Sequence, residues 1–233
     1  NLSGNQIGAI MAKYILEAHK NAGTLPENAA LCKSIVSTDL VTKIAESYGA
    51  TMFNVLTGFK FIAEKIQEFE EKHNHTYMMG FEESFGYLIK PFVRDKDAIQ
   101  AVLVVAELAA YYRSRGLTLA DGIEEIYKEY GYYAEKTISV TLSGVDGAEQ
   151  IKAIMAKFRN NAPKEWNATA ITVVEDFKAQ TATAADGTVT NLTTPPSDVL
   201  KYTLADGSWI AVRPSGTEPK IKFYIAVVGE SND

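Results

Sequence analysis

The chain has 233 residues, of which 46% are apolar and 22% are charged, and its formal net charge is -6 at pH 7. This negative charge argues against a nucleic-acid or anionic-membrane surface, so any anion must be recognised by a few locally placed cations. The sequence has no apolar run long enough to span a membrane and no signal peptide. Its single cysteine, Cys32, excludes an internal disulfide, and these features together favour a cytoplasmic protein.

Short apolar runs alternate with amphipathic helices over the first 131 residues. The predicted helices cover residues 6–18, 39–48, 59–72, 98–115 and 119–130, and the predicted strands cover residues 29–36, 51–55 and 77–81. Ser37 or Thr38, Asp97 and Thr118 are expected to cap the second, fourth and fifth helices. Because strands that alternate with helices indicate a parallel sheet covered on both faces, we predict a three-layer α/β domain with a mostly parallel sheet over residues 1–131.

The pattern changes after Gly131. A long strand is predicted at 133–142 and an amphipathic helix at 148–160, and strands without helices follow at 170–176, 188–192 and 199–204, with a last pair around residues 213–219. The dipeptides Asp186-Gly187 and Asp206-Gly207 are tight-turn signals between these strands. We therefore predict a smaller α+β domain with an antiparallel sheet over residues 132–233.

The connection between the last two predicted strands has the sequence RPSGTEP and is longer than a simple turn requires. A phosphate-binding loop needs inward-pointing amides, hydroxyl donors and usually one guanidinium. Gly216 permits a positive φ that lets successive amides converge, and Ser215 and Thr217 supply hydroxyls. Arg213 offers a planar fork that matches two phosphate oxygens. The alternative without a binding role is a long hairpin connection whose polar residues are simply exposed to solvent.

A second polar loop, GFEESFGY at residues 80–87, directly follows a buried predicted strand. Ligands of open α/β sheets bind beyond the carboxyl ends of the strands, where we expect Glu82, Glu83 and Ser84 to lie. Carboxylates only accept hydrogen bonds and suit sugar hydroxyls, whereas Ser84 can donate or accept. The alternative without a binding role is a surface loop with two solvated glutamates.

The segment VRDKDAI precedes the predicted helix at residue 98. Arg94 and Lys96 can hold an anion at this helix start, although the helix cap alone also explains the segment. With one cysteine and no clustered histidines, the sequence predicts no soft-metal site. It also contains no P-loop, no dinucleotide fingerprint and no arrangement that indicates a Ser–His–Asp triad.

In this order, these segments resemble the α-D-phosphohexomutase family, particularly its phosphoglucomutases. GFEESFGY looks like the sugar-binding loop of the family, which is written around G-E-x-S, and RPSGTEPKIK looks like the phosphate-binding loop of its last domain. TGFKFI, VRDKDAI and LSGNQIGAI are also similar to family segments. The family has four domains, and this chain resembles the third at residues 1–131 and the fourth at residues 132–233.

Two elements of the family are missing from this sequence. No T-x-S-H-N-P-like segment carries a phosphoserine, and no D-x-D-x-D-R segment supplies Mg²⁺ ligands. The chain also starts without Met, and Asn1 would fall a little after that metal loop. We therefore expect the C-terminal half of a longer enzyme, which has no catalytic residue or metal ligand of its own and is inactive without its N-terminal domains.

The resemblance implies that the intact enzyme uses Mg²⁺ and interconverts glucose 1-phosphate and glucose 6-phosphate through glucose 1,6-bisphosphate. It implies that Glu82 and Ser84 bind hydroxyls of the phosphorylated hexose. It implies that the phosphate is bound by Arg213, Ser215, Gly216, Thr217 and Lys96. The Glu-Glu-Ser form favours glucose, with phosphomannomutase-type specificity as the alternative. Outside catalysis, the alternatives are a phosphosugar-binding module and a structural domain pair.

Overall fold

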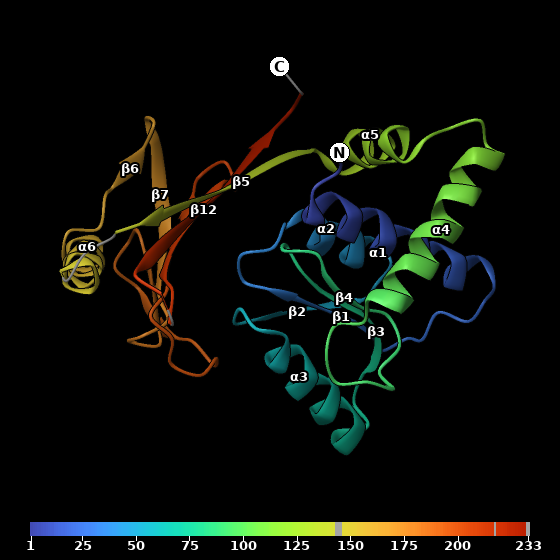
Figure 1. Cartoon of the computed structure of the whole chain (residues 1–233), viewed down its shortest axis with the longest axis horizontal. Helices are drawn as coiled ribbons and strands as arrows, with labels where there is room; N and C mark the ends of the chain where they lie inside the picture. Colours follow the sequence, from blue (N-terminus) through green and yellow to red (C-terminus); the bar gives the residue numbers. More distant parts are fainter. Residues whose placement is uncertain (143–145, 217, 232–233) are drawn as a thin grey trace. The chain divides into compact units, whose positions relative to one another are not determined.

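The computed structural model describes residues 1–142, 146–216 and 218–231, and the chain divides into two compact units (Figure 1). Of the described residues, 1–132 and 230–231 belong to unit 1, and those between 133 and 229 belong to unit 2. No helix formed by the described residues is both long and apolar enough to cross a membrane.

The sheet of unit 1 has the strand order β2-β1-β3-β4. Its strands are β1 (Ala29–Ser34), β2 (Thr51–Val55), β3 (Thr76–Glu82) and β4 (Gly86–Leu88). Strand β1 is parallel to both β2 and β3, whereas β4 is antiparallel to β3. The predicted mostly parallel sheet is confirmed. The sequence did not indicate β4, because a three-residue strand that starts with glycine has no periodicity to detect.

Helices cover both faces of this sheet, with α1 and α2 on one face and α3 on the other (Figure 1). The helices of unit 1 are α1 (Gly4–Asn21), α2 (Leu40–Ser47), α3 (Phe59–Lys72), α4 (Ala98–Ser114) and α5 (Leu119–Tyr130). Helix α1 starts earlier than predicted because Ser3 and Gln6 form a capping box.

Two of the three predicted helix caps are present in the structure. The side chains of Asp97 and Thr118 accept backbone N–H bonds at the starts of α4 and α5, as predicted. At α2 the N-cap residue is Asp39, and its side chain makes no capping bond. This carboxylate instead forms an ion pair with Lys33 at 2.8 Å, while the hydroxyl of Thr38 accepts the N–H of Leu40.

The core on one side of the sheet is formed by α3. Phe59, Ile62, Ile66 and Phe69 recur at helical spacing and pack against strand residues that include Cys32. Burying each of these side chains stabilises the fold by about 1.5 to 3 kcal/mol. The apolar face of α3 therefore fixes the position of its first residues beside the ends of β2 and β3.

The thiol of Cys32 is expected to be unreactive in the folded chain. Burial raises its pKa to about 12, whereas a thiol in an unfolded chain titrates near 8.5. The unfolded chain therefore loses this proton first, and the free energy of unfolding decreases as the pH rises from about 8.5 towards 12. At pH 8 we expect DTNB to modify the native chain at least about a hundredfold more slowly than the urea-unfolded chain. Equal rates would contradict this prediction.

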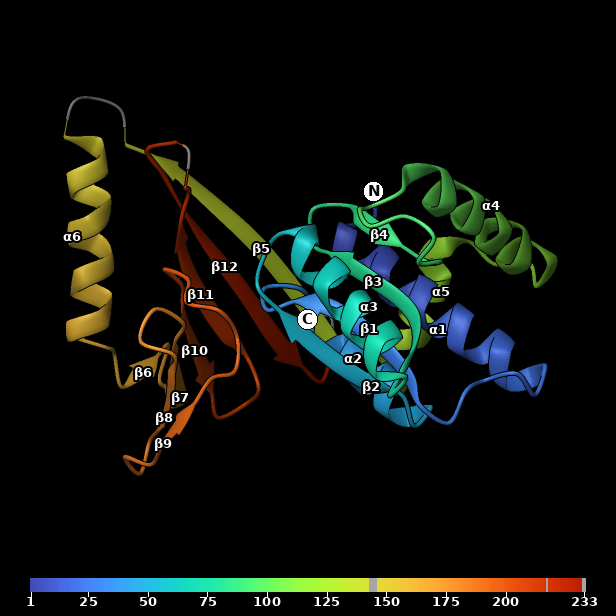
Figure 2. The ribbon, with the colours of Figure 1, turned by 90° about the horizontal axis from the view of Figure 1, so that it is seen from below.

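Unit 2 is an antiparallel sheet with one long helix, as predicted (Figure 2). The strand order is β5-β12-β11-β10-β7-β8-β9, and β6 pairs with β7. The strands are β5 (Tyr132–Thr141), β6 (Glu165–Trp166), β7 (Thr169–Asp176), β8 (Thr181–Ala184), β9 (Val189–Asn191), β10 (Leu200–Leu204), β11 (Trp209–Pro214) and β12 (Lys220–Gly229). The short strands β6 and β8 were not predicted. The helix is α6 (Gly147–Asn160).

Helix α6 packs on one face of this sheet. Ile151 and Met155 lie in a cluster with strand residues that include Tyr202 and Val212. Gly187 and Gly207 have φ values of 86° and 85°, which confirms the turns predicted at these glycines. The cluster fixes α6 against β11 and β12, the strands on either side of the predicted phosphate-binding loop.

Candidate functional site

The predicted sugar-binding loop is the end of the β3–β4 hairpin. Glu82 is the last residue of β3 and pairs with Gly86 of β4. The expectation that Glu82 lies beyond the strand is therefore wrong, because the return strand β4 extends the pairing to this residue. Glu83, Ser84 and Phe85 form the tip of the hairpin, and Phe85 has a φ of 65°.

The carboxylate of Glu82 is held in place from a neighbouring strand end. Only 8% of the residue is exposed, and its Oε1 accepts the backbone N–H of Gly58 at 2.7 Å. Gly58 precedes α3 and follows β2, whose carboxyl end lies at the same edge of the sheet as that of β3. This bond fixes the carboxylate at the edge where α/β sheets bind ligands.

The side chains of Glu82 and Lys96 both lie close to Gly86. A Cβ placed on Gly86 would lie 3.2 Å from Cδ of Lys96 and 3.6 Å from Oε2 of Glu82. The Lys96 side chain is 55% exposed and forms an ion pair with Asp95 at 3.0 Å, which holds the pKa of that carboxyl below its usual value. The structure thus brings together a sequence-predicted carboxylate and a sequence-predicted cation, with the exposed Ser84 on the adjoining tip.

Glu83 is supported by Ser34, which the sequence did not single out, and Ser34 in turn contacts Ser37, which the sequence suggested only as a helix cap. Its Oε2 accepts a hydrogen bond from the hydroxyl of Ser34 at 3.2 Å, and the hydroxyls of Ser34 and Ser37 lie 2.8 Å apart. Both serines are fully buried at the end of β1. The only sequence signal is a pair of polar residues, Lys33 and Ser34, at the end of a buried strand.

The predicted phosphate-binding loop connects β11 and β12. Arg213 and Pro214 end β11, and the backbone N–H of Ser215 donates to the carbonyl of Lys220 at 2.7 Å. This bond closes the loop, so the Ser215 amide does not face a ligand. Gly216 does not have a positive φ, so the conformation expected at this glycine is wrong. Thr217 lies outside the described residues.

A cavity of about 640 Å³ opens beside this loop. Its described lining residues are Ala148, Ile151, Lys152, Ser197, Asp198, Arg213, Pro214, Ser215, Gly216, Glu218 and Pro219. Sequence reasoning found the loop members of this set. It missed the members from α6 and from the segment before β10, because they come from elsewhere in unit 2.

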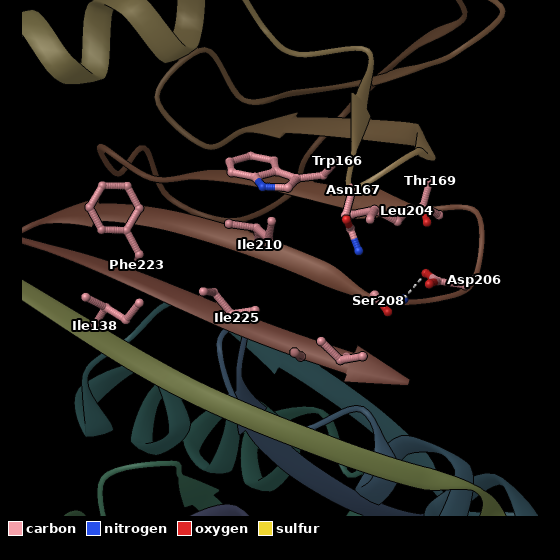
Figure 3. Close-up of a pocket in the computed structure, with 12 residues that line it drawn as sticks. Ile138, Trp166, Asn167, Thr169, Leu204, Asp206, Ser208, Ile210, Phe223 and Ile225 are labelled. Atoms are coloured by element: carbon pink, nitrogen blue, oxygen red, sulfur yellow. Dashed lines mark hydrogen bonds between the residues drawn. The ribbon is translucent and has the colours of Figure 1, made fainter. Parts of the chain in front are cut away.

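A second cavity of unit 2, of about 370 Å³, is mostly apolar (Figure 3). Trp166, Ile210 and Ile225 lie around it, and at one end the amide of Ser208 donates to Asp206 at 2.8 Å. No lysine or arginine is among its described lining residues. Because a phosphate needs cationic or amide donors, the cavity beside Arg213 suits an anion and this one does not.

The described residues do not fit a magnesium site. Within residues 1–142, 146–216 and 218–231, no three or more His, Cys, Asp and Glu side chains are grouped closely enough to hold a metal ion. Mg²⁺ prefers carboxylate oxygens and water in near-octahedral geometry. The carboxylates near the hairpin instead have protein partners: Glu82 accepts from Gly58, and Asp95 is paired with Lys96.

Comparison with known proteins identifies both halves of the chain. Residues 3–130 match the family model described as phosphoglucomutase/phosphomannomutase, alpha/beta/alpha domain III, and residues 148–231 match its C-terminal domain. A phosphoglucomutase of Staphylococcus aureus is 38% identical over 226 residues, which are 97% of this chain and 40% of that protein. The chain thus spans about 40% of the length of this curated relative.

Two solved structures have a similar fold. Parafusin, a phosphoglucomutase from Paramecium in an open form, is 17% identical with a TM-score of 0.66, over 99% of this chain and 38% of that one. An N-acetylphosphoglucosamine mutase of Aspergillus fumigatus, in complex with glucose 1,6-bisphosphate, is 12% identical with a TM-score of 0.50, over 98% of this chain and 40% of that one.

Proposed function

This chain belongs to the phosphoglucomutase/phosphomannomutase family, and on this premise we propose that the intact protein interconverts glucose 1-phosphate and glucose 6-phosphate in the cytoplasm. The observation that carries the proposal is that the side chains of Glu82 and Lys96 both lie close to Gly86, at the sheet edge where a sugar phosphate would bind. We assign the sugar-binding domain to residues 1–131 and the phosphate-binding domain to residues 132–233.

The proposed roles divide the substrate between two places. Glu82 and Ser84 bind sugar hydroxyls that are common to both orientations of the substrate. Lys96 neutralises phosphoryl charge, since phosphoryl transfer depends mainly on positioning and electrostatics. The phosphate that is not being transferred is held by Arg213, Ser215, Gly216 and Thr217. None of these residues carries the transferred group, so this chain supplies binding rather than covalent chemistry.

The transferred phosphoryl group comes, in this proposal, from a serine in domains that precede this chain. The phosphoserine transfers its phosphoryl group to the free hydroxyl of the substrate, which gives glucose 1,6-bisphosphate and a free serine. The bisphosphate then turns around and returns its other phosphoryl group to the serine. Magnesium ligands are assigned to the same domains. A structural relative that is complexed with glucose 1,6-bisphosphate supports this intermediate.

An exposed apolar face on α4 supports the proposal that further domains are the partners of this chain. Ile99, Val102 and Leu103 are 83%, 69% and 68% exposed. Apolar side chains gathered on one helix are typical of interaction surfaces. The relative that matches 97% of this chain is much longer than the chain, so it contains additional protein that can cover such a face.

Glucose is the proposed sugar, and mannose is the second candidate. The Glu-Glu-Ser form at residues 82–84 favours glucose, and the curated relative is a phosphoglucomutase. The family description names both phosphoglucomutase and phosphomannomutase.

We expect the isolated 233-residue chain to show no mutase turnover. The reason is that its sequence lacks the segments that would carry the phosphoserine and the metal ligands. The test measures glucose 6-phosphate formed from glucose 1-phosphate by the pure chain and by the chain joined to the first two domains of a phosphoglucomutase relative. The joined protein should turn over, and Glu82→Ala should abolish its activity.

Three other outcomes have distinct meanings. Turnover by the pure chain that is lost in Glu82→Ala would show that the catalytic groups lie within it. Equal turnover of mannose 1-phosphate by the joined protein would favour phosphomannomutase-type specificity. Tight glucose 6-phosphate binding by the chain, with no turnover by the joined protein, would favour a phosphosugar-binding module.

A further inference from the structure

We propose that Lys152 of α6 is a second cation of the phosphate cavity and favours binding of the phosphate dianion. The inference rests on the proposed role of the Arg213 loop. Lys152 lines the same cavity as Arg213, Ser215 and Gly216, although it lies about sixty residues earlier in the sequence. No sequence motif points to it, because it is one of two lysines on an amphipathic helix.

The start of α6 is packed against the end of the loop. A Cβ placed on Gly147 would lie 2.0 Å from the carbonyl oxygen of Leu142 and 3.5 Å from Cβ of Pro219. The N–H of Leu142 also donates to the carbonyl of Pro219 at 2.9 Å. Figure 2 shows the first residues of α6 and the β11–β12 connection at the same end of unit 2. These contacts hold the start of α6 beside the loop, and Lys152 lies five residues further along the same helix.

The charges around the cavity favour an anion. Two carboxylates line it, and each is paired with a cation from outside the lining: Asp198 with Arg159 at 2.7 Å, and Glu218 with Lys220 at 2.8 Å. The second ion pair also holds the pKa of Glu218 below its usual value. Lys152 and Arg213 have no ion pair within the described part of the chain.

These two cations match the charge of a phosphate monoester. Such a group carries about -1.5 to -2 charges at pH 7, because its second pKa is about 6. The guanidinium of Arg213 contributes one positive charge and a fork for two oxygens, whereas an ammonium is a compact charge on a flexible stem that can reach the remaining oxygen. Lys152 therefore supplies the second charge that the dianion requires and the monoanion does not.

The test compares phosphate affinity at two pH values. Inorganic phosphate and glucose 6-phosphate are titrated into the ¹⁵N-labelled 233-residue chain at pH 5.5 and pH 7.5, with the amide shifts of Ser215 and Gly216 as the readout. At pH 7.5 we expect Lys152→Ala to weaken binding about tenfold, the loss of one charge-assisted hydrogen bond. At pH 5.5 we expect the same substitution to weaken binding by about threefold or less, since one cation is enough to balance the charge of the monoanion. Lys152→Arg should retain the wild-type affinity.

Lys157→Ala is the matched control. Lys157 is an exposed lysine of the same helix that lines a different cavity, so its removal should leave phosphate affinity unchanged. If Lys152→Ala behaves like this control while Arg213→Ala loses binding, the inference about Lys152 is overturned and the proposed role of the loop stands. If wild type does not bind, or if Arg213→Ala binds like wild type, both are overturned. Because Lys152 is exposed, its substitution leaves the core intact.

Discussion

Replacing Arg213 by alanine is expected to weaken binding of glucose 6-phosphate by about a hundredfold. Arg213 is half-buried at the end of β11 and lines the cavity beside the loop. Its guanidinium can donate two charge-assisted hydrogen bonds to one phosphate, each worth about 1.5 kcal/mol, and their sum of about 3 kcal/mol corresponds to roughly a hundredfold in affinity. The measurement is the dissociation constant for glucose 6-phosphate by calorimetry or amide shifts.

Two variants show whether phosphate affinity depends on the bidentate geometry of the Arg213 guanidinium or only on its charge. Arg213→Lys keeps the charge but loses the bidentate geometry, so it should recover only part of the lost affinity. Arg113→Ala removes an exposed arginine from the last turn of α4 and should bind like wild type. Plain glucose should show no difference among the variants, because it carries no phosphate. An Arg213→Ala chain with wild-type affinity for glucose 6-phosphate would exclude this loop as the phosphate site.

Replacing Gly4 by alanine is expected to destabilise unit 1 by about 3 kcal/mol, since overpacking of this kind typically costs 1 to 3 kcal/mol or more. A Cβ on Gly4 would lie 2.0 Å from the carbonyl oxygen of Glu83 and 3.0 Å from the backbone nitrogen of Phe85. Both are backbone atoms at the hairpin tip, so the first turn of α1 and the tip must separate. The hydrogen bond from the Tyr87 hydroxyl to the Gly4 carbonyl, at 2.8 Å, would be strained as well.

Gly8→Ala is the matched comparison for this variant. Gly8 lies in the same helix, and its new Cβ would meet the ring of Phe81 at 2.7 Å. A side chain can adjust more easily than backbone can move, and the interior position of Gly8 also gains about 1 kcal/mol of helix propensity, whereas Gly4 is the first residue of α1. We therefore expect a larger fall in the urea midpoint for Gly4→Ala, with an unchanged slope. Weaker binding of the sugar phosphate should accompany it. A Gly4→Ala chain as stable as wild type would show that the tip moves freely.

Much of the fold was readable from local sequence. Helices 59–72 and 119–130 begin and end at the predicted residues, because their apolar spacing, their flanking glycines and a Thr118 cap all agree. The alternation of strands and helices before residue 131, and of strands and turns after it, was enough to predict one mostly parallel and one antiparallel sheet. The two candidate binding loops were also visible, since their residue types do not fit a simple turn.

Only the tertiary structure decided how the site is supported. Glu82 is fixed by Gly58 and Glu83 by Ser34, partners that lie 24 and 49 residues away and meet them through the parallel pairing of β1 with its neighbours. Lys152 lines the cavity beside Arg213 because α6 packs against β11 and β12. Local patterns encode hydrogen bonds between near neighbours and the face that a helix or strand buries. The partner across a sheet depends on register and packing, which no short segment contains.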